Sequence, residues 1–180
     1  FKIQDGIHNL LVQIYVDDII SGSTNKELCE KFSKLIKSEF EMSRMGELNY
    51  FLGLQVKQFN EGIFINQTKY TRDLIAKFGL EKGNSKKIIK IPMNTSTRMD
   101  LDEDSQPIEE YKYRKLIGSL LYLTVNRPDI TYAVGVCARF QSKPKLSHYQ
   151  TALKIIKYLR GTINVGLWYP KDSELKLIGY

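Results

Sequence analysis

Residues 10–20 read Leu-Leu-Val-Gln-Ile-Tyr-Val-Asp-Asp-Ile-Ile, and this stretch decides the fold of the first part of the chain. Strand-forming residues lead to two adjacent carboxylates, Asp17 and Asp18, and the apolar pair Ile19 and Ile20 follows directly. A surface turn is one explanation, because Asp is a common turn residue. The apolar flanks favour another, in which two neighbouring carboxylates hold a proton or bind a cation. We therefore predict a strand–turn–strand hairpin that presents both carboxylates.

A carboxylate pair at a turn has the chemistry of a metal site. Hard divalent cations such as Mg²⁺ favour carboxylate oxygen, and Mn²⁺ is the alternative ion. Paired metal ions held by carboxylates clamp the attacking and the leaving oxygen in phosphoryl transfer. We therefore predict Asp17 and Asp18 to be catalytic metal ligands.

The composition is that of an ordinary globular chain. Its 180 residues are enough for one domain or two small ones with a packed core. No apolar run approaches the length of a membrane span, so we expect no membrane partner. The two cysteines, Cys29 and Cys137, lie far apart, which argues against a disulfide scaffold or a cysteine zinc site and favours an intracellular, reducing location.

The net charge of +7 understates how basic most of the chain is. Residues 100–110 contain six acids and no base, and removing these charges leaves +13 for the remainder. Such an excess favours a polyanionic partner, with solvated lysines as the alternative.

Residues 1–92 alternate between strand and helix patterns. Strands are predicted at 1–4 and 10–16. A helix follows, and the spacing of Thr24 and Glu27 is that of a capping box.

A second hairpin is predicted over 51–65 with its turn at 60–62, followed by a helix over 68–78. Gly53 lies inside the first strand pattern. It marks either a bulge or a place where another part of the backbone comes close.

Residues 93–110 have no helix or strand period, little apolar content and the acid cluster, and they predict a linker between two domains. Residues 111–162 contain three helical patterns, which predict a separable helical bundle. Residues 163–180 alternate as a strand, a turn and the start of another strand, which predicts a β-hairpin at this end. The predicted fold class is therefore α+β, and Arg127 and Asp129 are interpreted as tying a helix start to its neighbour.

Five basic residues give the predicted bundle a basic side. They are Lys143, Lys145, Lys154, Lys157 and Arg160. Lysine and arginine contacts to phosphates supply affinity that is independent of sequence, so this side is a candidate nucleic-acid-binding surface. A solvated helix face is the equally weighted alternative.

Five motifs, in this order and spacing, resemble the reverse transcriptase region of copia-type retrotransposon Pol polyproteins. They are Tyr15–Asp18, Tyr50–Leu54, Tyr113–Tyr122, Arg127–Ile130 and Tyr158–Thr162. The resemblance covers nearly the whole chain. It implies RNA-templated DNA synthesis by two-metal nucleotidyl transfer to a primer 3′ end, with an RNA or DNA template, a primer and deoxynucleoside triphosphates as partners.

The resemblance also implies a role for each part of the chain. Residues 1–92 are similar to part of a polymerase palm, an antiparallel sheet with packed helices. The acidic linker at 93–110 separates it from a thumb or connection region at 111–162, and 163–180 is similar to the start of ribonuclease H. Leu52, Gly53 and Leu54 resemble the primer grip, for which a strand with a bulge is the alternative.

Polymerases of this family use a third metal-binding Asp on an earlier strand and a fingers region, and neither fits into the residues before Leu10. We therefore expect this chain to need upstream Pol segments and to be inactive alone. An active element is expected in a cytoplasmic particle or the nucleus. The alternative function is that of a decayed or repurposed nucleic-acid-binding remnant without catalysis.

Overall fold

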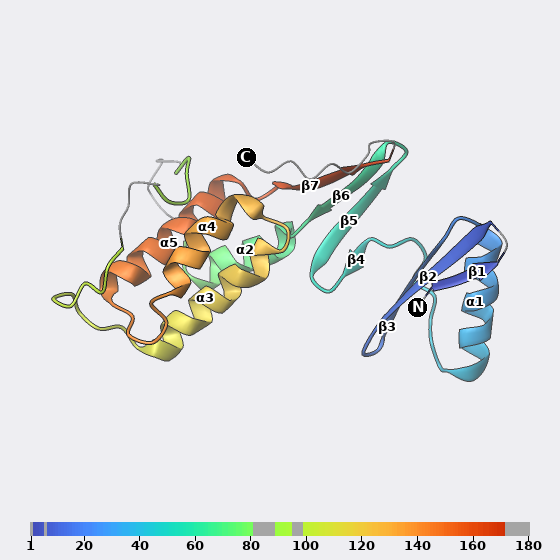
Figure 1. Cartoon of the computed structure of the whole chain (residues 1–180), viewed down its shortest axis with the longest axis horizontal. Helices are drawn as coiled ribbons and strands as arrows, with labels where there is room; N and C mark the ends of the chain where they lie inside the picture. Colours follow the sequence, from blue (N-terminus) through green and yellow to red (C-terminus); the bar gives the residue numbers. More distant parts are fainter. Residues whose placement is uncertain (1, 6, 81–88, 95–98, 172–180) are drawn as a thin grey trace. The chain divides into compact units, whose positions relative to one another are not determined.

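The computed structural model describes residues 2–5, 7–80, 89–94 and 99–171. The chain divides into two compact units, Phe1–Leu48 and Asn49–Tyr180. Each unit combines helix with antiparallel sheet, so the predicted α+β class is confirmed (Figure 1). Among the described residues no helix is both long enough and apolar enough to cross a membrane.

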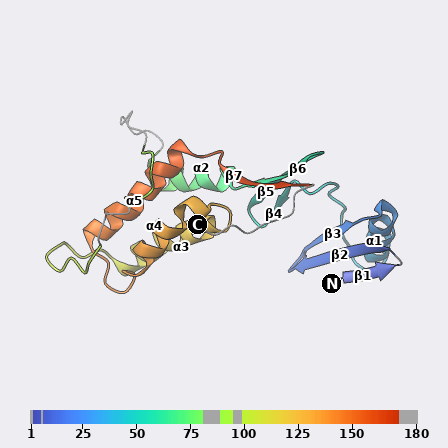
Figure 2. The same ribbon diagram turned by 45° about the horizontal axis from the view of Figure 1, so that its top comes forward.

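The first unit is a three-stranded sheet with one helix. Its strands β1 (Lys2–Asp5), β2 (His8–Tyr15) and β3 (Asp18–Ser23) pair in that order, and α1 (Lys26–Glu39) lies against β3 (Figure 2). Leu10 and Val12 of β2 are only 5% and 4% exposed, whereas Leu11 between them and Gln13 after them are exposed. This alternation is the strand period that the sequence shows, and the predicted hairpin is confirmed.

The cap of α1 differs from the prediction by one residue. The side chain of Asn25 accepts a hydrogen bond from the Glu27 amide at 2.9 Å, so Asn25 caps the helix. Thr24 is still tied to β2, because its amide donates to Asn9 O at 3.2 Å and its hydroxyl accepts from Asn9 N at 3.1 Å. The helix therefore begins only after Thr24 has completed these contacts.

The second unit contains a four-stranded antiparallel sheet in the order β4-β5-β6-β7. Its strands are β4 (Tyr50–Phe51), β5 (Leu54–Phe59), β6 (Gly62–Asn66) and β7 (Gly166–Pro170). The predicted hairpin over 51–65 is confirmed as β5 and β6, and β7 pairs with β6 along its length (Figure 1). The second strand of the hairpin predicted at 163–180 lies outside the described residues.

Four helices share the main hydrophobic core. They are α2 (Thr68–Lys77), α3 (Glu110–Thr124), α4 (Pro128–Ala138) and α5 (Leu146–Gly161). Leu74 and Ile75 of α2 are 3% exposed and belong to the same cluster as the buried residues of the other three helices. The helical bundle therefore includes α2, which the sequence assigned to the preceding part of the chain, because α2 packs on α5.

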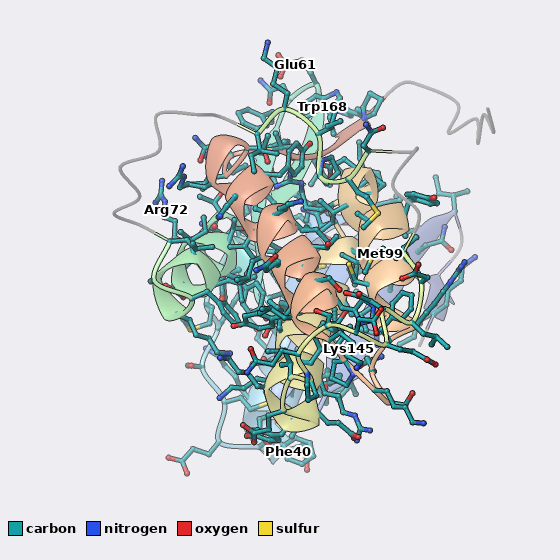
Figure 3. All side chains as sticks on the ribbon, turned by 90° about the vertical axis from the view of Figure 1, so that its left-hand side faces the viewer. Phe40, Glu61, Arg72, Met99, Lys145 and Trp168 are labelled. Atoms are coloured by element: carbon teal, nitrogen blue, oxygen red, sulfur yellow. The ribbon has the colours of Figure 1, made fainter. Side chains whose placement is uncertain are left out.

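The acidic segment, taken as its described residues 99–109, is docked on the connection between α4 and α5. Ile108 N donates to Pro144 O at 2.9 Å, and Leu146 N donates to Gln106 O at 2.8 Å. Lys145 Nζ, near the start of α5, donates to Glu103 O at 2.8 Å (Figure 3). These backbone contacts place the segment inside the second compact unit. The domain limits drawn at 92 and 110 remain a prediction.

His148 joins the acidic segment to α5 and has a structural role. Its Nδ1 accepts a hydrogen bond from Lys145 N at 3.0 Å, so Nε2 carries the proton and donates to Asp100 O at 2.8 Å. The ring is 2% exposed and stacks on Phe140 with 4.0 Å between centroids.

Arg127 is buried at the start of α4, and four hydrogen bonds hold its guanidinium. Its Nε and Nη2 donate to the carboxylate of Asp129 at 2.9 and 2.7 Å. Its Nη1 and Nη2 also donate to the backbone oxygen and the hydroxyl of Thr162 at 2.9 and 2.7 Å. Tyr158 completes the network by donating to Asp129 Oδ2 at 2.7 Å. The interpretation of Arg127 and Asp129 as a tie between a helix start and its neighbour is confirmed.

The same network sets the protonation of Asp129. Burial alone would raise the pKa of this carboxyl, but hydrogen bonds from Arg127 and Tyr158 and the charge of Arg127 outweigh burial and lower it. A carboxyl whose pKa is lower in the folded chain stabilises the fold above its unfolded pKa, about 3.9. That contribution is lost as the pH falls through the folded pKa.

We predict that Asp129→Asn lowers the free energy of unfolding by about 2 kcal/mol at pH 7, because it leaves the buried guanidinium with neutral partners only. Urea unfolding at pH 7 and at pH 3 measures the effect, and the difference from the unmodified chain should shrink at pH 3. Asp73→Asn, an exposed position on α2, is the control. An equal difference at both pH values would contradict the prediction.

Candidate functional site

The acid pair lies at a tight turn between β2 and β3. Tyr15 and Asp18 are paired across the strands, so Val16 and Asp17 form a two-residue loop. Val16 has a φ of 52°, which is unusual for a β-branched residue. A positive φ at the first loop residue is a feature of the primed turns that fit the twist of a hairpin.

Asp18 lies on the open face of the first sheet. It shares this face with its partner Tyr15, opposite the face on which Leu10 and Val12 are buried. Asp17 lies in the turn itself, and both carboxylates are exposed. The apolar residues that precede the acid pair do not bury it, because Tyr15 and Val16 are themselves 54% and 80% exposed.

The two carboxylates fit a hard divalent cation by their donor chemistry. They stand on consecutive residues and offer only oxygen ligands. Across the described ranges, no group of three or more His, Cys, Asp or Glu side chains could hold a metal ion. The structure thus brings together two candidate ligands, and their role as metal ligands stays a prediction.

Leu52, Gly53 and Leu54 form a second tight turn. Phe51 pairs with Leu54, and the two residues between them have φ values of 48° for Leu52 and 78° for Gly53. Positive φ at both loop positions is the signature of a type I′ turn. Gly53 is the second loop residue of a tight turn, so the bulge, one of the two alternatives given for this glycine, is not what the structure shows.

This turn is held against α2 and α3. The hydroxyl of Tyr122 donates to Leu52 O, and a Cβ added to Gly53 would overlap that hydroxyl. The ring of Tyr122 meets the ring of Tyr70 edge-on, with 4.6 Å between centroids. Gln67 Nε2 donates to Tyr122 O at 3.2 Å. The second alternative for Gly53 is the close approach of another part of the backbone, whereas the group that comes close is the side chain of Tyr122 on α3.

Two shallow surface hollows that share Lys115 lie beside α2 and α3, and we call this pair of hollows the α2–α3 groove. The first has a volume of about 480 Å³ and is lined by Tyr70, Lys115, Gly118, Ser119 and Tyr122. The second has a volume of about 370 Å³ and is lined by Lys77, Phe78, Gly79, Lys112, Lys115 and Tyr149. The lining contains three lysines and no carboxylate, which favours an anionic ligand.

The sequence reasoning did not find this groove, although part of its signal is visible. Lys112 and Lys115 are spaced to share one side of a helix. Lys77 lies at the end of a different helix, and only the packing of α2 in the bundle brings it into the same lining.

The five basic residues predicted to bind nucleic acid do not all face solvent. Lys143, Lys154 and Lys157 are exposed. Lys145 donates to backbone oxygens of the acidic segment, and Arg160 Nη1 donates to Leu80 O at 3.2 Å. Nucleic-acid binding by these residues stays a prediction.

A family model described as reverse transcriptase (RNA-dependent DNA polymerase) matches residues 1–94. The chain therefore belongs to the reverse transcriptase family. Its relatives include Pol polyproteins of copia-type transposons, and the resemblance of the five motifs to that family is confirmed.

Two Arabidopsis thaliana proteins illustrate this relationship. The retrovirus-related Pol polyprotein from transposon RE1 is 32% identical over 180 residues, which is 100% of this chain and 12% of the polyprotein. An uncharacterized mitochondrial protein is 30% identical over 167 residues, which is 91% of this chain and 67% of that protein. The chain thus spans about an eighth of the polyprotein that it matches. No solved structure matches the chain.

We predict that Val16→Asn stabilises the chain by about 1 kcal/mol, because Asn tolerates a positive φ whereas a β-branched residue is strained there. Val16 is 80% exposed, so the substitution removes little packing. Val16→Thr, which keeps the branch and adds polarity, is the matched control and should leave stability nearly unchanged. Urea unfolding followed by circular dichroism measures both, and equal effects of the two substitutions would count against strain at Val16.

Proposed function

We propose that this chain is a palm-to-thumb fragment of an RNA-directed DNA polymerase that extends a primer 3′ end by nucleotidyl transfer. The observation that carries the proposal is the exposed acid pair on its tight turn, in a chain that belongs to the reverse transcriptase family. The 52–54 turn and the lysine-lined groove support it, because they offer sites for the primer and for the duplex behind it.

Asp17 and Asp18 are the proposed ligands of Mg²⁺ or Mn²⁺. Such ions stabilise the charge that develops on the attacking and leaving oxygens of phosphoryl transfer. The exposure of both carboxylates on the turn and on the open sheet face leaves room for a triphosphate and a primer end. A further ligand is expected from an upstream Pol segment.

The α2–α3 groove is the proposed seat of the duplex backbone. Lys77, Lys112 and Lys115 would neutralise phosphates, and the lining also includes tyrosines. Phosphate contacts position a duplex without reading its sequence, as a polymerase requires. The template, the primer, the deoxynucleoside triphosphate and the upstream Pol segments are the proposed partners, within a cytoplasmic particle or the nucleus.

We predict that the chain supports metal-dependent primer extension when it is joined to the preceding polymerase segment of a similar transposon polyprotein. Asp17→Asn should lower the extension rate by at least about 100-fold, because it removes a charged metal ligand. Glu39→Gln, at the end of α1 in the same unit, is the control and should leave the rate unchanged. Primer extension by Asp17→Asn at the unmodified rate would overturn the proposed catalysis.

We also predict that the 180-residue chain binds an RNA–DNA duplex and that the affinity falls as salt rises. Lys112→Gln with Lys115→Gln should reduce the slope of log affinity against log salt by about two, or about one for each phosphate that is no longer neutralised. Lys154→Gln with Lys157→Gln, on α5, is the matched control.

A reduced slope in the α5 pair alone would move the duplex to the side that the sequence suggested. If neither double variant changed the salt dependence of duplex binding, neither the groove nor the basic side of α5 would be the binding surface. Duplex binding without any extension by the joined enzyme would favour the second candidate function, a nucleic-acid-binding remnant without catalysis, which the lysine lining of the groove also supports.

A further inference from the structure

The side chain of Tyr122, on α3, both lines the α2–α3 groove and contacts the 52–54 turn. Its ring lines the groove beside Gly118, and its hydroxyl donates to the backbone oxygen of Leu52. We propose that Tyr122 is a positioning residue that fixes the 52–54 turn relative to a duplex in the groove. This inference rests on the proposed function and deepens it by naming the contact that joins two of its parts.

The turn needs an anchor outside its own hairpin. β4 has two residues, Tyr50 and Phe51, which pair with Gln55 and Leu54, and one further backbone hydrogen bond, from Val56 N to Asn49 O at 2.9 Å, extends this short hairpin. Leu52 is 41% exposed, and its φ of 48° is costly for a residue with a side chain. A short strand with a strained loop opens readily unless a tertiary contact holds it. The hydroxyl of Tyr122 supplies that contact.

Gly53 fits this contact in two ways. Its φ of 78° lies in the left-handed region that glycine adopts most readily. A Cβ at this position would overlap the Tyr122 hydroxyl and lie 3.0 Å from Cζ of the same ring. The absence of a side chain at Gly53 therefore lets Tyr122 reach the backbone of the turn.

Tyr122 is itself held in place from α2. The ring of Tyr70 packs edge-on against it, and Tyr70 Oη donates to Ser119 O at 3.3 Å. Gln67 is 2% exposed, and its side chain donates to Tyr122 O. Burial raises the pKa of Tyr122 above its ordinary value. The contact on Leu52 is thus fixed by both helices that line the groove.

The first experiment measures amide hydrogen exchange of residues 50–55 in the 180-residue chain. In Tyr122→Phe the exchange should be roughly fivefold faster, the change expected when one hydrogen bond is removed. Tyr149→Phe is the matched control, because Tyr149 lines the far end of the groove and does not touch the turn. Unchanged exchange in Tyr122→Phe would overturn the inference.

The second experiment repeats the exchange measurement with a bound duplex, because a purely structural role of Tyr122 would not alter the effect of the duplex on the turn. An RNA–DNA duplex bound to the unmodified chain should slow exchange at residues 50–55, and in Tyr122→Phe it should still bind but no longer slow it. Slowing of equal size in both proteins would overturn the inference. Failure of the unmodified chain to bind any duplex would instead contradict the proposed function. The comparison of hydrogen exchange in the free chains would then still test whether Tyr122 holds the turn.

Gly53→Ala tests the fit from the other side. Alone it should speed exchange at residues 50–55, because the Cβ displaces Tyr122. In the Tyr122→Phe background the same substitution should have a smaller effect, since the worst overlap is with the hydroxyl. Strictly additive effects would overturn the inference, and circular dichroism confirms that each variant is folded.

Discussion

A guanidinium as deeply buried as that of Arg127 is tolerated only while every charge and donor around it is matched, and the second unit is arranged to supply those partners. Asp129 neutralises it from the first turn of α4, and Thr162 receives it at the end of α5. The next residue, Ile163, accepts a hydrogen bond from Thr68 at the start of α2. One buried charge thus fixes where α5 ends and where the chain turns back toward the sheet.

Asn126, the residue before Arg127, connects the start of α4 to the sheet. Asn126 is 3% exposed, and its side chain donates to Ile65 O of β6 at 2.8 Å. The Arg127–Ile130 and Tyr158–Thr162 motifs meet in space through these contacts. These two motifs therefore have a shared structural role, because together they fix the helices relative to the sheet. The catalytic proposal depends on other residues, in the other unit.

The sequence predicted those features whose signal is local. The strands around Asp17 and Asp18 and the four helices follow from period-two and helical patterns, which depend on neighbours in the chain. The docking of the acidic segment was not predictable in this way, because it uses backbone groups of Gln106 and Pro144. The groove was missed for a related reason, since Lys77 joins Lys112 only after two helices pack. The pattern of residues 10–20 located the acid pair, and the resemblance to a known family singled out Leu52–Leu54, but neither identified the side chain of Tyr122 that contacts the turn.

The pairing of β7 with β6 makes the second sheet dependent on the whole bundle that separates them in the sequence. During synthesis β5 and β6 leave the ribosome long before β7 does, so β6 presents an unpaired edge while α3, α4 and α5 are still being made. Contacts between residues so far apart in the chain form slowly. Synthesis that stopped within α5 would leave that edge of β6 open to other strands, and completion of β7 pairs it and takes its place at the edge of the sheet.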